Sequence, residues 1–220
     1  MLFRSPTLFQ AGSQAFFDHQ PMRRAIDHPS RIWRSVRWGR TAEFFVLDCR
    51  SERKPSTRAG PDAEYVSPAQ LDWLKKGLAA SPARFKVILN SVPISEFGGA
   101  LFQPFGEDRW EGYPAQRREI LQHIDDLSLP GVLWVAGDFH LASMGHVSRE
   151  RPGHDAIEVL VGPGAQAPNV SPAYPRAPQF DWSSGINNYT TLGLDPSSGE
   201  VEITFHDAAD RVLTRRSYPL

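Results

Sequence analysis

Three short apolar runs separated by two helix-like segments constrain the fold of this 220-residue chain most strongly. The runs are TAEFFVL at 41–47, RFKVILNSVPI at 84–94 and GVLWVAG at 131–137. Each is rich in the β-branched and aromatic residues typical of buried strands. Strands that alternate with helices predict an α/β layered architecture, and consecutive strands joined in this way lie side by side and run parallel.

The two segments between these runs carry helix signals. In SPAQLDWLKKGLAAS (67–81), Ser67 is a favourable N-cap, Pro68 suits the first helical position and Gln70 completes a capping box. In AQRREILQHIDDL (115–127), four apolar residues recur at helical spacing. Both segments are therefore predicted to be helices with one apolar face.

The second part of the chain has a different character. DAIEVLVG (155–162) predicts a further strand, a proline-rich loop follows at 163–178, and 187–218 has the pattern of antiparallel strands with turns at 195–199 and 206–210. We expect one domain over 1–220, with an α/β part at 1–140 and a β-rich tail at 156–220.

Charge and cysteine content restrict the functional classes. Lys and Arg number 24 against 25 Asp and Glu, so the total charge favours neither a nucleic-acid nor a membrane partner. The arginine-rich stretch 23–40, with Trp33 and Trp38, is open to a nucleic-acid interpretation, but a solvated face or phosphate binding is favoured. Cys49 is the only cysteine, which excludes an internal disulfide and predicts a buried thiol. The sequence shows neither an apolar run long enough to span a membrane nor an export signal.

Polar side chains follow each of the three predicted strands. Because ligands of open α/β sheets bind at the carboxyl ends of the strands, we expect these groups to gather at one edge. They are Asp48 and Arg50 after the first strand, Asn90 and Ser91 after the second, and Asp138 and His140 after the third.

Two types of ligand suit these groups. Carboxylate oxygen and imidazole nitrogen bind hard and borderline cations, and residues two apart on a strand share a face, so Asp138 and His140 form a candidate metal site. Arg50 is a candidate bidentate donor to a phosphate. Structural alternatives remain open: Asp138 as a turn cap, His140 as a core histidine, an Asp48–Arg50 ion pair, and Asn90 as a partner of backbone groups.

Several blocks of the chain resemble the PhoD-like alkaline phosphatase family, and they occur in the family's order. These blocks are AGSQAFFDHQPMRR (11–24), RSVRWGRTAEFFVLD (34–48), LDCRSER (47–53), SPAQLDWLKKGLAASPARFKVILNSVPI (67–94), DRWEGYPAQRREIL (108–121) and LWVAGDFH (133–140). Each block alone is a weak signal, but the ordered set is specific.

The resemblance implies a metallophosphatase with a layered α/β/β/α sandwich that hydrolyses phosphate esters, with iron and calcium as the metals. Metal ions in such a site generate the hydroxide that attacks phosphorus and offset charge on the phosphate oxygens. The metal ligands would be Asp138, His140 and Asn90. The catalytic set would be Asn90, Arg50 and His140, and the substrate-binding set would be Arg50, Trp110 and Tyr113.

The resemblance also implies an earlier half of the fold, carrying Asp-x-His and Gly-Asp motifs, and this chain begins downstream of it. The chain is therefore expected to lack the N-terminal half of the sandwich. One interpretation is the C-terminal part of a phosphatase whose other half precedes it or comes from a neighbouring subunit. The other is a non-catalytic remnant that serves as a binding or structural module. Family members are often exported, but nothing in this sequence indicates a compartment.

Overall fold

The structure is a computed structural model, and it describes residues 5–97, 106–167 and 178–220. The chain divides into two units, 1–33 and 34–220. The first contains α1 (Pro6–His19), which begins with proline after the N-cap Ser5. In the described part of the chain, no helix has the length and apolar character needed to cross a membrane.

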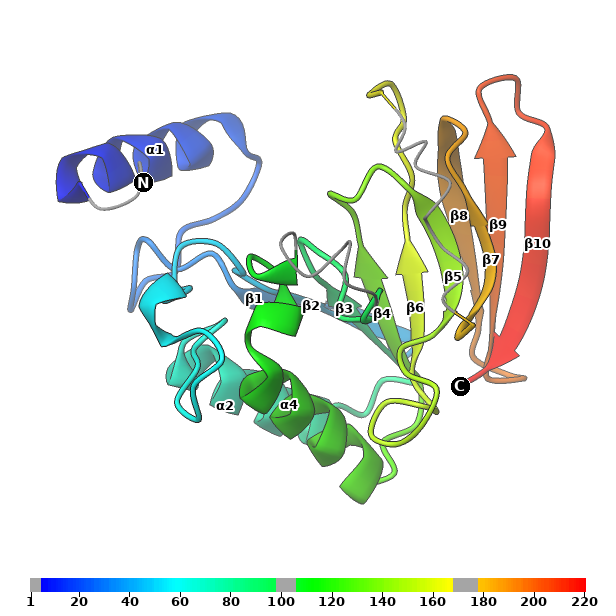
Figure 1. Cartoon of the computed structure of the whole chain (residues 1–220), viewed down its shortest axis with the longest axis horizontal. Helices are drawn as coiled ribbons and strands as arrows, with labels where there is room; N and C mark the ends of the chain where they lie inside the picture. The colour runs from blue at the N-terminus through cyan, green and yellow to red at the C-terminus, as the bar shows by residue number, and fades with distance from the viewer. Residues whose placement is uncertain (1–4, 98–105, 168–177) are drawn as a thin grey trace. The chain divides into compact units, whose positions relative to one another are not determined.

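A seven-stranded mixed sheet forms the centre of the second unit (Figure 1). In spatial order its strands are β1 (Arg34–Trp38), β2 (Ala42–Val46), β3 (Phe85–Leu89), β4 (Val132–Ala136), β6 (Ile157–Leu160), β5 (Ala142–His146) and β7 (Phe180–Ser184). The adjacent pairs β2–β3, β3–β4 and β4–β6 are parallel. This confirms the parallel arrangement predicted for the first three strands. The sequence did not predict β1, β5 or β7, all of which pair antiparallel.

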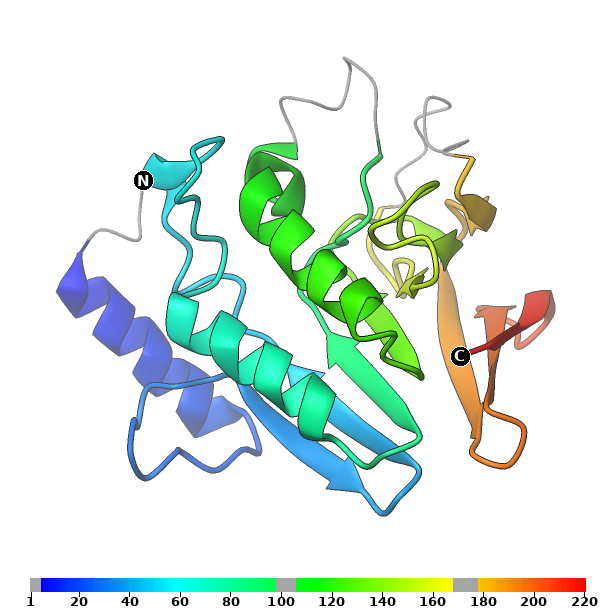
Figure 2. The same ribbon diagram turned by 90° about the horizontal axis from the view of Figure 1, so that it is seen from below.

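Two helices cover one face of this sheet (Figure 2). They are α2 (Pro68–Ala80) and α4 (Pro114–Asp126), joined by an ion pair between Lys75 and Glu119 at 2.6 Å. The short 3₁₀ helices η2 (Pro55–Thr57) and η3 (Trp110–Gly112) lie in the connections. Gly77 lets α2 approach the sheet, because a Cβ there would lie 2.6 Å from the Phe45 ring. Both helices confirm their predictions from the sequence.

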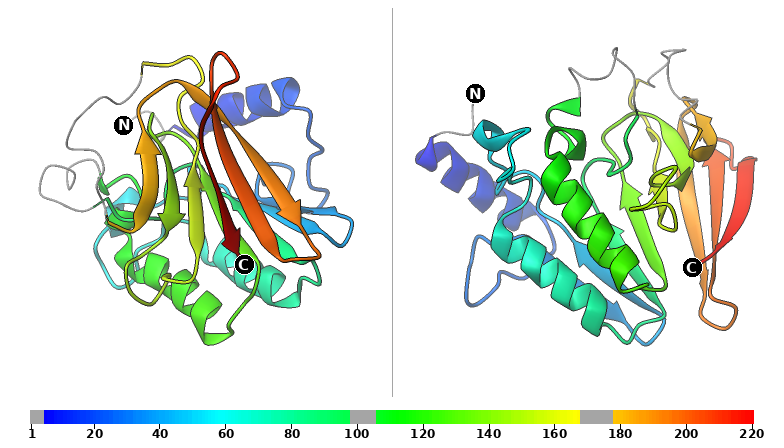
Figure 3. Two further views of the ribbon diagram at one scale, coloured as in Figure 1. Left: turned by 90° about the vertical axis from the view of Figure 1, so that its right-hand side faces the viewer. Right: turned by 60° about the horizontal axis from the view of Figure 1, so that its bottom comes forward.

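A three-stranded antiparallel sheet covers the other face (Figure 3). Its strands are β8 (Asn188–Asp195), β9 (Glu200–Asp207) and β10 (Val212–Pro219), in the order β10-β9-β8. Alternate residues of β9, namely Val201, Ile203 and Phe205, are fully buried against the seven-stranded sheet. The unit is thus a mixed α/β sandwich in which helices, a large sheet and a small sheet form successive layers.

Candidate functional site

The carboxyl ends of β2, β3 and β4 lie at one edge of the sheet, as the sequence predicts. Val46 is paired with Leu89, and Leu89 with Val135, so the three strands end level with one another. The backbone hydrogen bonding continues one residue beyond β3, where the backbone N–H of Asn90 donates to the carbonyl of Val135 at 2.9 Å. The segments that begin at Leu47, Asn90 and Gly137 therefore leave the sheet side by side.

The carboxylate of Asp48 is used within its own loop. It accepts hydrogen bonds from the backbone amide of Arg50 at 3.1 Å and from the amide and hydroxyl of Ser51. The side chain of Gln70, at the start of α2, holds the backbone of Asp48 through bonds of 2.8 and 3.1 Å. Gln70 thus fixes this loop to α2 instead of completing a capping box, and Glu52 accepts from the Ser67 amide in its place.

Asn90 is buried beneath this edge with its amide in a defined orientation. Its Oδ1 accepts from the indole Nε1 of Trp110 at 3.3 Å and from the thiol of Cys49 at 3.0 Å. An indole nitrogen can only donate, so the oxygen of the Asn90 amide must face Trp110. This fixes Nδ2 as the remaining group, and this buried donor has no partner among the described residues.

The role of Asn90 as a metal ligand stays a prediction, and the geometry adds a second role to it. An amide oxygen has two lone pairs, and both are directed at donors here. The Nδ2 amide of Asn90 has no partner among the described residues, and its N–H groups suit a phosphate oxygen or a water molecule.

The thiol of Cys49 is a donor in this cluster and not a nucleophile. Cys49 is buried, as the sequence predicts, and burial raises the pKa of its thiol to about 12. Reactive cysteines need a thiolate at working pH, and this environment favours the protonated thiol of Cys49.

Asp138 and His140 lie just beyond β4, and both side chains are exposed. Both residues adopt the left-handed backbone conformation, with φ of 68° and 55°. For non-glycine residues this conformation costs roughly 1 kcal/mol or more each, and it is enriched at functional sites. Within the described ranges, neither side chain has a hydrogen-bond or ion-pair partner, so the proposed roles of turn cap and buried structural histidine do not apply.

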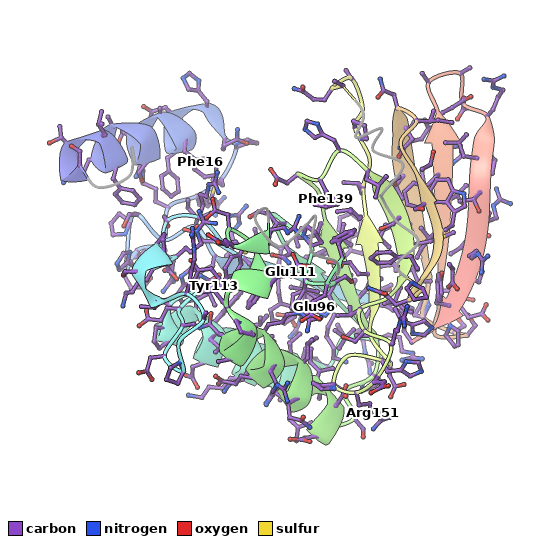
Figure 4. All side chains as sticks on the ribbon, viewed as in Figure 1. Phe16, Glu96, Glu111, Tyr113, Phe139 and Arg151 are labelled. Carbon is purple, nitrogen blue, oxygen red and sulfur yellow. The ribbon has the colours of Figure 1, made fainter. Side chains whose placement is uncertain are left out.

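Phe139, between them, holds the loop in this conformation (Figure 4). Its ring is buried and stacks on Phe97 with centroids 4.2 Å apart, and the Arg109 guanidinium lies 4.6 Å above it. Glu111 fixes both neighbours, because it accepts from the Arg109 side chain and from the Phe97 amide. Burying a phenylalanine contributes about 1.5–3 kcal/mol, which is comparable to the strain of its two neighbours. Burial of Phe139 therefore turns Asp138 and His140 outward.

The segment after Asn90 is held by a buried carboxyl group. Glu158 on β6 is fully buried and accepts from the backbone amides of Ile94 at 2.8 Å and Ser95 at 3.0 Å. Arg117 of α4 donates from Nε to the Ile94 carbonyl at 2.6 Å and pairs with Glu96 at 3.0 Å. Burial raises the pKa of Glu158, and the hydrogen bonds from Ile94 and Ser95 oppose that shift. Sequence reasoning missed these residues, because isolated Glu and Arg residues carry no signal of long-range contact.

Glu158 makes the stability of the chain depend on pH. Because its pKa is raised in the folded state, its contribution is complete below the unfolded pKa and is lost as the pH rises through the folded pKa. We expect the isosteric variant Glu158→Gln to lose that dependence. Between the unfolded and folded pKa of Glu158, the unfolding free energy of the wild type should fall by up to about 1.4 kcal/mol per pH unit relative to that of the variant. Urea unfolding of both proteins from pH 4 to 9 tests this, and parallel stability curves would contradict it.

The other predicted site residues differ in how much of each side chain is exposed. Arg50 is exposed, as a phosphate ligand requires. Trp110 and Tyr113 are both fully buried, with ring centroids 4.4 and 5.1 Å from that of Tyr65. The roles of Trp110 and Tyr113 as substrate-binding residues stay a prediction.

The metal-binding capacity of the described residues is incomplete. Asp138 and His140 supply the oxygen and nitrogen donors that a hard or borderline cation accepts. Yet no group of three or more His, Cys, Asp or Glu side chains in the described segments is placed to hold a metal ion.

Comparisons with known proteins identify the family. The family model of the PhoD-like phosphatases matches residues 4–209. Alkaline phosphatase D of Bacillus subtilis (strain 168) is 30% identical over 159 residues, which are 64% of this chain and 27% of that protein. The chain therefore spans about a quarter of this curated relative.

Solved structures share the fold. A structure of PhoD has a TM-score of 0.73 at 18% identity and covers 96% of this chain, which in turn covers 46% of PhoD. Purple acid phosphatase PPD1 from yellow lupin (Lupinus luteus) seeds has a TM-score of 0.59 at 12% sequence identity. The match covers 87% of this chain and 33% of that chain. GAP50, the anchor in the inner membrane complex of Plasmodium, has a TM-score of 0.55 at 12% sequence identity. The match covers 86% of this chain and 53% of that chain. Since the family model spans nearly the whole chain, this protein belongs to the PhoD-like phosphatase family.

Proposed function

We propose that this chain is the C-terminal part of a metal-dependent phosphoester hydrolase, and that its site lies at the carboxyl ends of β2, β3 and β4. The observation that carries the proposal is the loop 137–140, which displays a carboxylate and an imidazole in strained backbone conformations beside a buried amide donor. Strain of this kind persists where surrounding packing enforces it, and the Phe139–Phe97 stack does so here.

Each residue has a distinct role in the proposal. Asp138 and His140 bind metal, with iron and calcium suggested by the family resemblance. The exposed Arg50 binds phosphate oxygens and compensates their charge without a change of protonation. Asn90 donates from Nδ2 to a phosphate oxygen or to an ordered water, which would satisfy a buried donor that otherwise lacks a partner. Metal ions, when bound, supply an activated water and charge neutralisation.

The proposal includes a second contributor to the site. Asp138 and His140 are two ligands, whereas metallophosphatase chemistry uses a fuller coordination shell. We propose that the remaining ligands come from the part of the PhoD-like fold that this chain does not span, supplied by the same polypeptide or by a neighbouring subunit.

The test is an assay of metal content and hydrolysis. We expect the purified chain of 220 residues to bind iron or calcium weakly and to show little turnover of p-nitrophenyl phosphate or bis-p-nitrophenyl phosphate. Addition of the missing part should raise metal affinity and turnover together. Failure of the assembled form to hydrolyse either ester with any added metal would refute the enzymatic proposal.

A non-catalytic binding or structural module is the second candidate function. Two observations favour it: the described residues hold no group of three or more His, Cys, Asp or Glu side chains placed to bind a metal, and GAP50, which shares the fold, is the anchor in the inner membrane complex of Plasmodium. On this alternative the assembled form binds no metal, and substitution of Asp138 or His140 changes nothing measurable. The assay above therefore separates the two candidates.

A further inference from the structure

The short helix η3 is connected to two separate groups of predicted site residues. One group is Asn90, which follows β3, and the other is Asp138 and His140, which follow β4. Trp110, the first residue of η3, donates from its indole Nε1 to Oδ1 of Asn90 at 3.3 Å. Glu111, the second residue of η3, is connected to the other group through a chain of contacts (Figure 4).

Glu111 holds two further segments, one with each of its carboxylate oxygens. Its Oε1 accepts from the backbone N–H of Phe97 at 2.9 Å, and its Oε2 accepts from Nε of Arg109 at 3.0 Å. Gly106 packs against the same carboxylate, because a Cβ at this position would lie 2.8 Å from Oε2. The carboxylate of Glu111 therefore fixes Phe97 and Arg109 relative to η3.

Phe97 and Arg109 in turn hold the ring of Phe139. The Phe97 centroid lies 4.2 Å from that of Phe139, and the Arg109 guanidinium lies 4.6 Å from the Phe139 centroid and 5.5 Å from the Phe97 centroid. Each of the three groups thus contacts the other two. Aromatic and cation–π contacts depend on orientation as well as distance, so these contacts fix how the Phe139 ring lies. The backbone on either side of this ring carries Asp138 and His140 in the left-handed conformation.

The ion pair between Arg109 and Glu111 is suited to specifying geometry. The exposed fractions of the two side chains are only 6% and 18%. Removing both charges from water costs about as much free energy as their attraction returns, so such a pair adds little net stability. Its hydrogen bonds are directional, however, and they hold the guanidinium in one orientation beside the two rings.

We propose that Glu111 is a positioning residue, and that η3 keeps Asn90 and the loop 137–140 in fixed relative positions. Glu111 acts through Phe97 and Arg109. Loss of its carboxylate releases the Phe139 ring and lets the loop leave the left-handed conformation. The inference rests on the proposed function for what the loop binds, but the conformation of the loop is measurable without any metal.

The test compares glycine with alanine at positions 138 and 140, by urea unfolding of the 220-residue chain. Both replacements remove the polar side chain, but only glycine adopts a positive φ without steric cost. With Glu111 present, each glycine variant should have a folding equilibrium constant about threefold higher than that of its alanine counterpart. With Glu111→Gln this ratio should fall to one or below, because alanine is favoured over glycine where φ is negative.

Two further variants separate positioning from a general loss of stability. Glu111→Gln leaves the buried charge of Arg109 unpaired, so the double variant Arg109→Met, Glu111→Gln removes that charge as well and should show the same lowered ratio. Ile203→Ala is the matched control, because it destabilises the chain from β9, in the core between the two sheets. It should leave the ratio unchanged. An unchanged ratio with Glu111→Gln, or an equal fall with Ile203→Ala, would overturn the proposal.

Metal affinity provides a second measurement on the assembled protein, with iron and calcium each added alone. Glu111→Gln should weaken binding by about tenfold, and Ile203→Ala should change it by less than about twofold. Equal affinities of these two variants would also overturn the positioning role. If the assembled protein binds neither metal, the proposed function fails, whereas the glycine-to-alanine ratios still decide whether Glu111 sets the conformation of the loop.

Discussion

Replacement of Asp138 or His140 by asparagine is expected to lower metal-dependent ester hydrolysis of the assembled protein by on the order of 10²-fold or more. Each variant removes a proposed metal ligand that no other described side chain contacts. Asparagine is chosen because both positions have positive φ, a conformation that asparagine adopts more readily than alanine. Both side chains are exposed, so the free energy of unfolding should change by less than about 0.5 kcal/mol.

Asp210→Asn provides a matched control for Asp138→Asn. Asp210 is also exposed and has a φ of 62°, but it lies in the β9–β10 turn. Hydrolysis and metal content should be measured together for the three variants. Full turnover in Asp138→Asn or His140→Asn would show that the loop 137–140 is not the metal site, whatever the activity of the protein.

Replacement of Trp110 by alanine is expected to destabilise the chain by about 3–5 kcal/mol. The indole is fully buried among the aromatic rings of Tyr65 and Trp134, and its removal leaves a cavity in the helix-side core.

Trp38→Ala and Trp110→Phe separate the contributions of Trp110. Trp38 is 74% exposed, so its replacement should change the unfolding free energy by no more than about 0.5 kcal/mol. Trp110→Phe keeps an aromatic ring but removes the donor to Asn90, and we expect a loss of about 1–2 kcal/mol. Urea unfolding of the three variants gives these values, and a loss below about 1 kcal/mol for Trp110→Ala would show that the position tolerates a cavity.

Local sequence signals predicted the elements that depend on local physics. The helix at 68–80 begins where Ser67 and Pro68 predict it, because capping is settled within one turn. Strands β2, β3 and β4 were predicted because each is a predominantly apolar run, and most of their residues are buried. In contrast, β1 is largely exposed and β5 contains serine, glycine and histidine. These two are strands because of their neighbours in the sheet, which no local pattern reports.

The candidate site divides in the same way. That Asp48, Asn90 and Asp138 follow strands which end at one edge was predictable, because parallel strands place their carboxyl ends together. The state of each side chain was not. The Asn90 amide is oriented by an indole twenty positions away, Asp138 is turned outward by a Phe139–Phe97 stack, and Ile94 is held by Glu158 from another strand.

The sequence by itself determined the strand–helix alternation, the positions of the polar groups at strand ends, and the family resemblance. All three are properties of short segments read in order. Only the tertiary structure decided which of those groups are exposed and which atom of Asn90 has no partner among the described residues. These depend on contacts between residues far apart in the chain, and packing settles them only when the whole sandwich has formed.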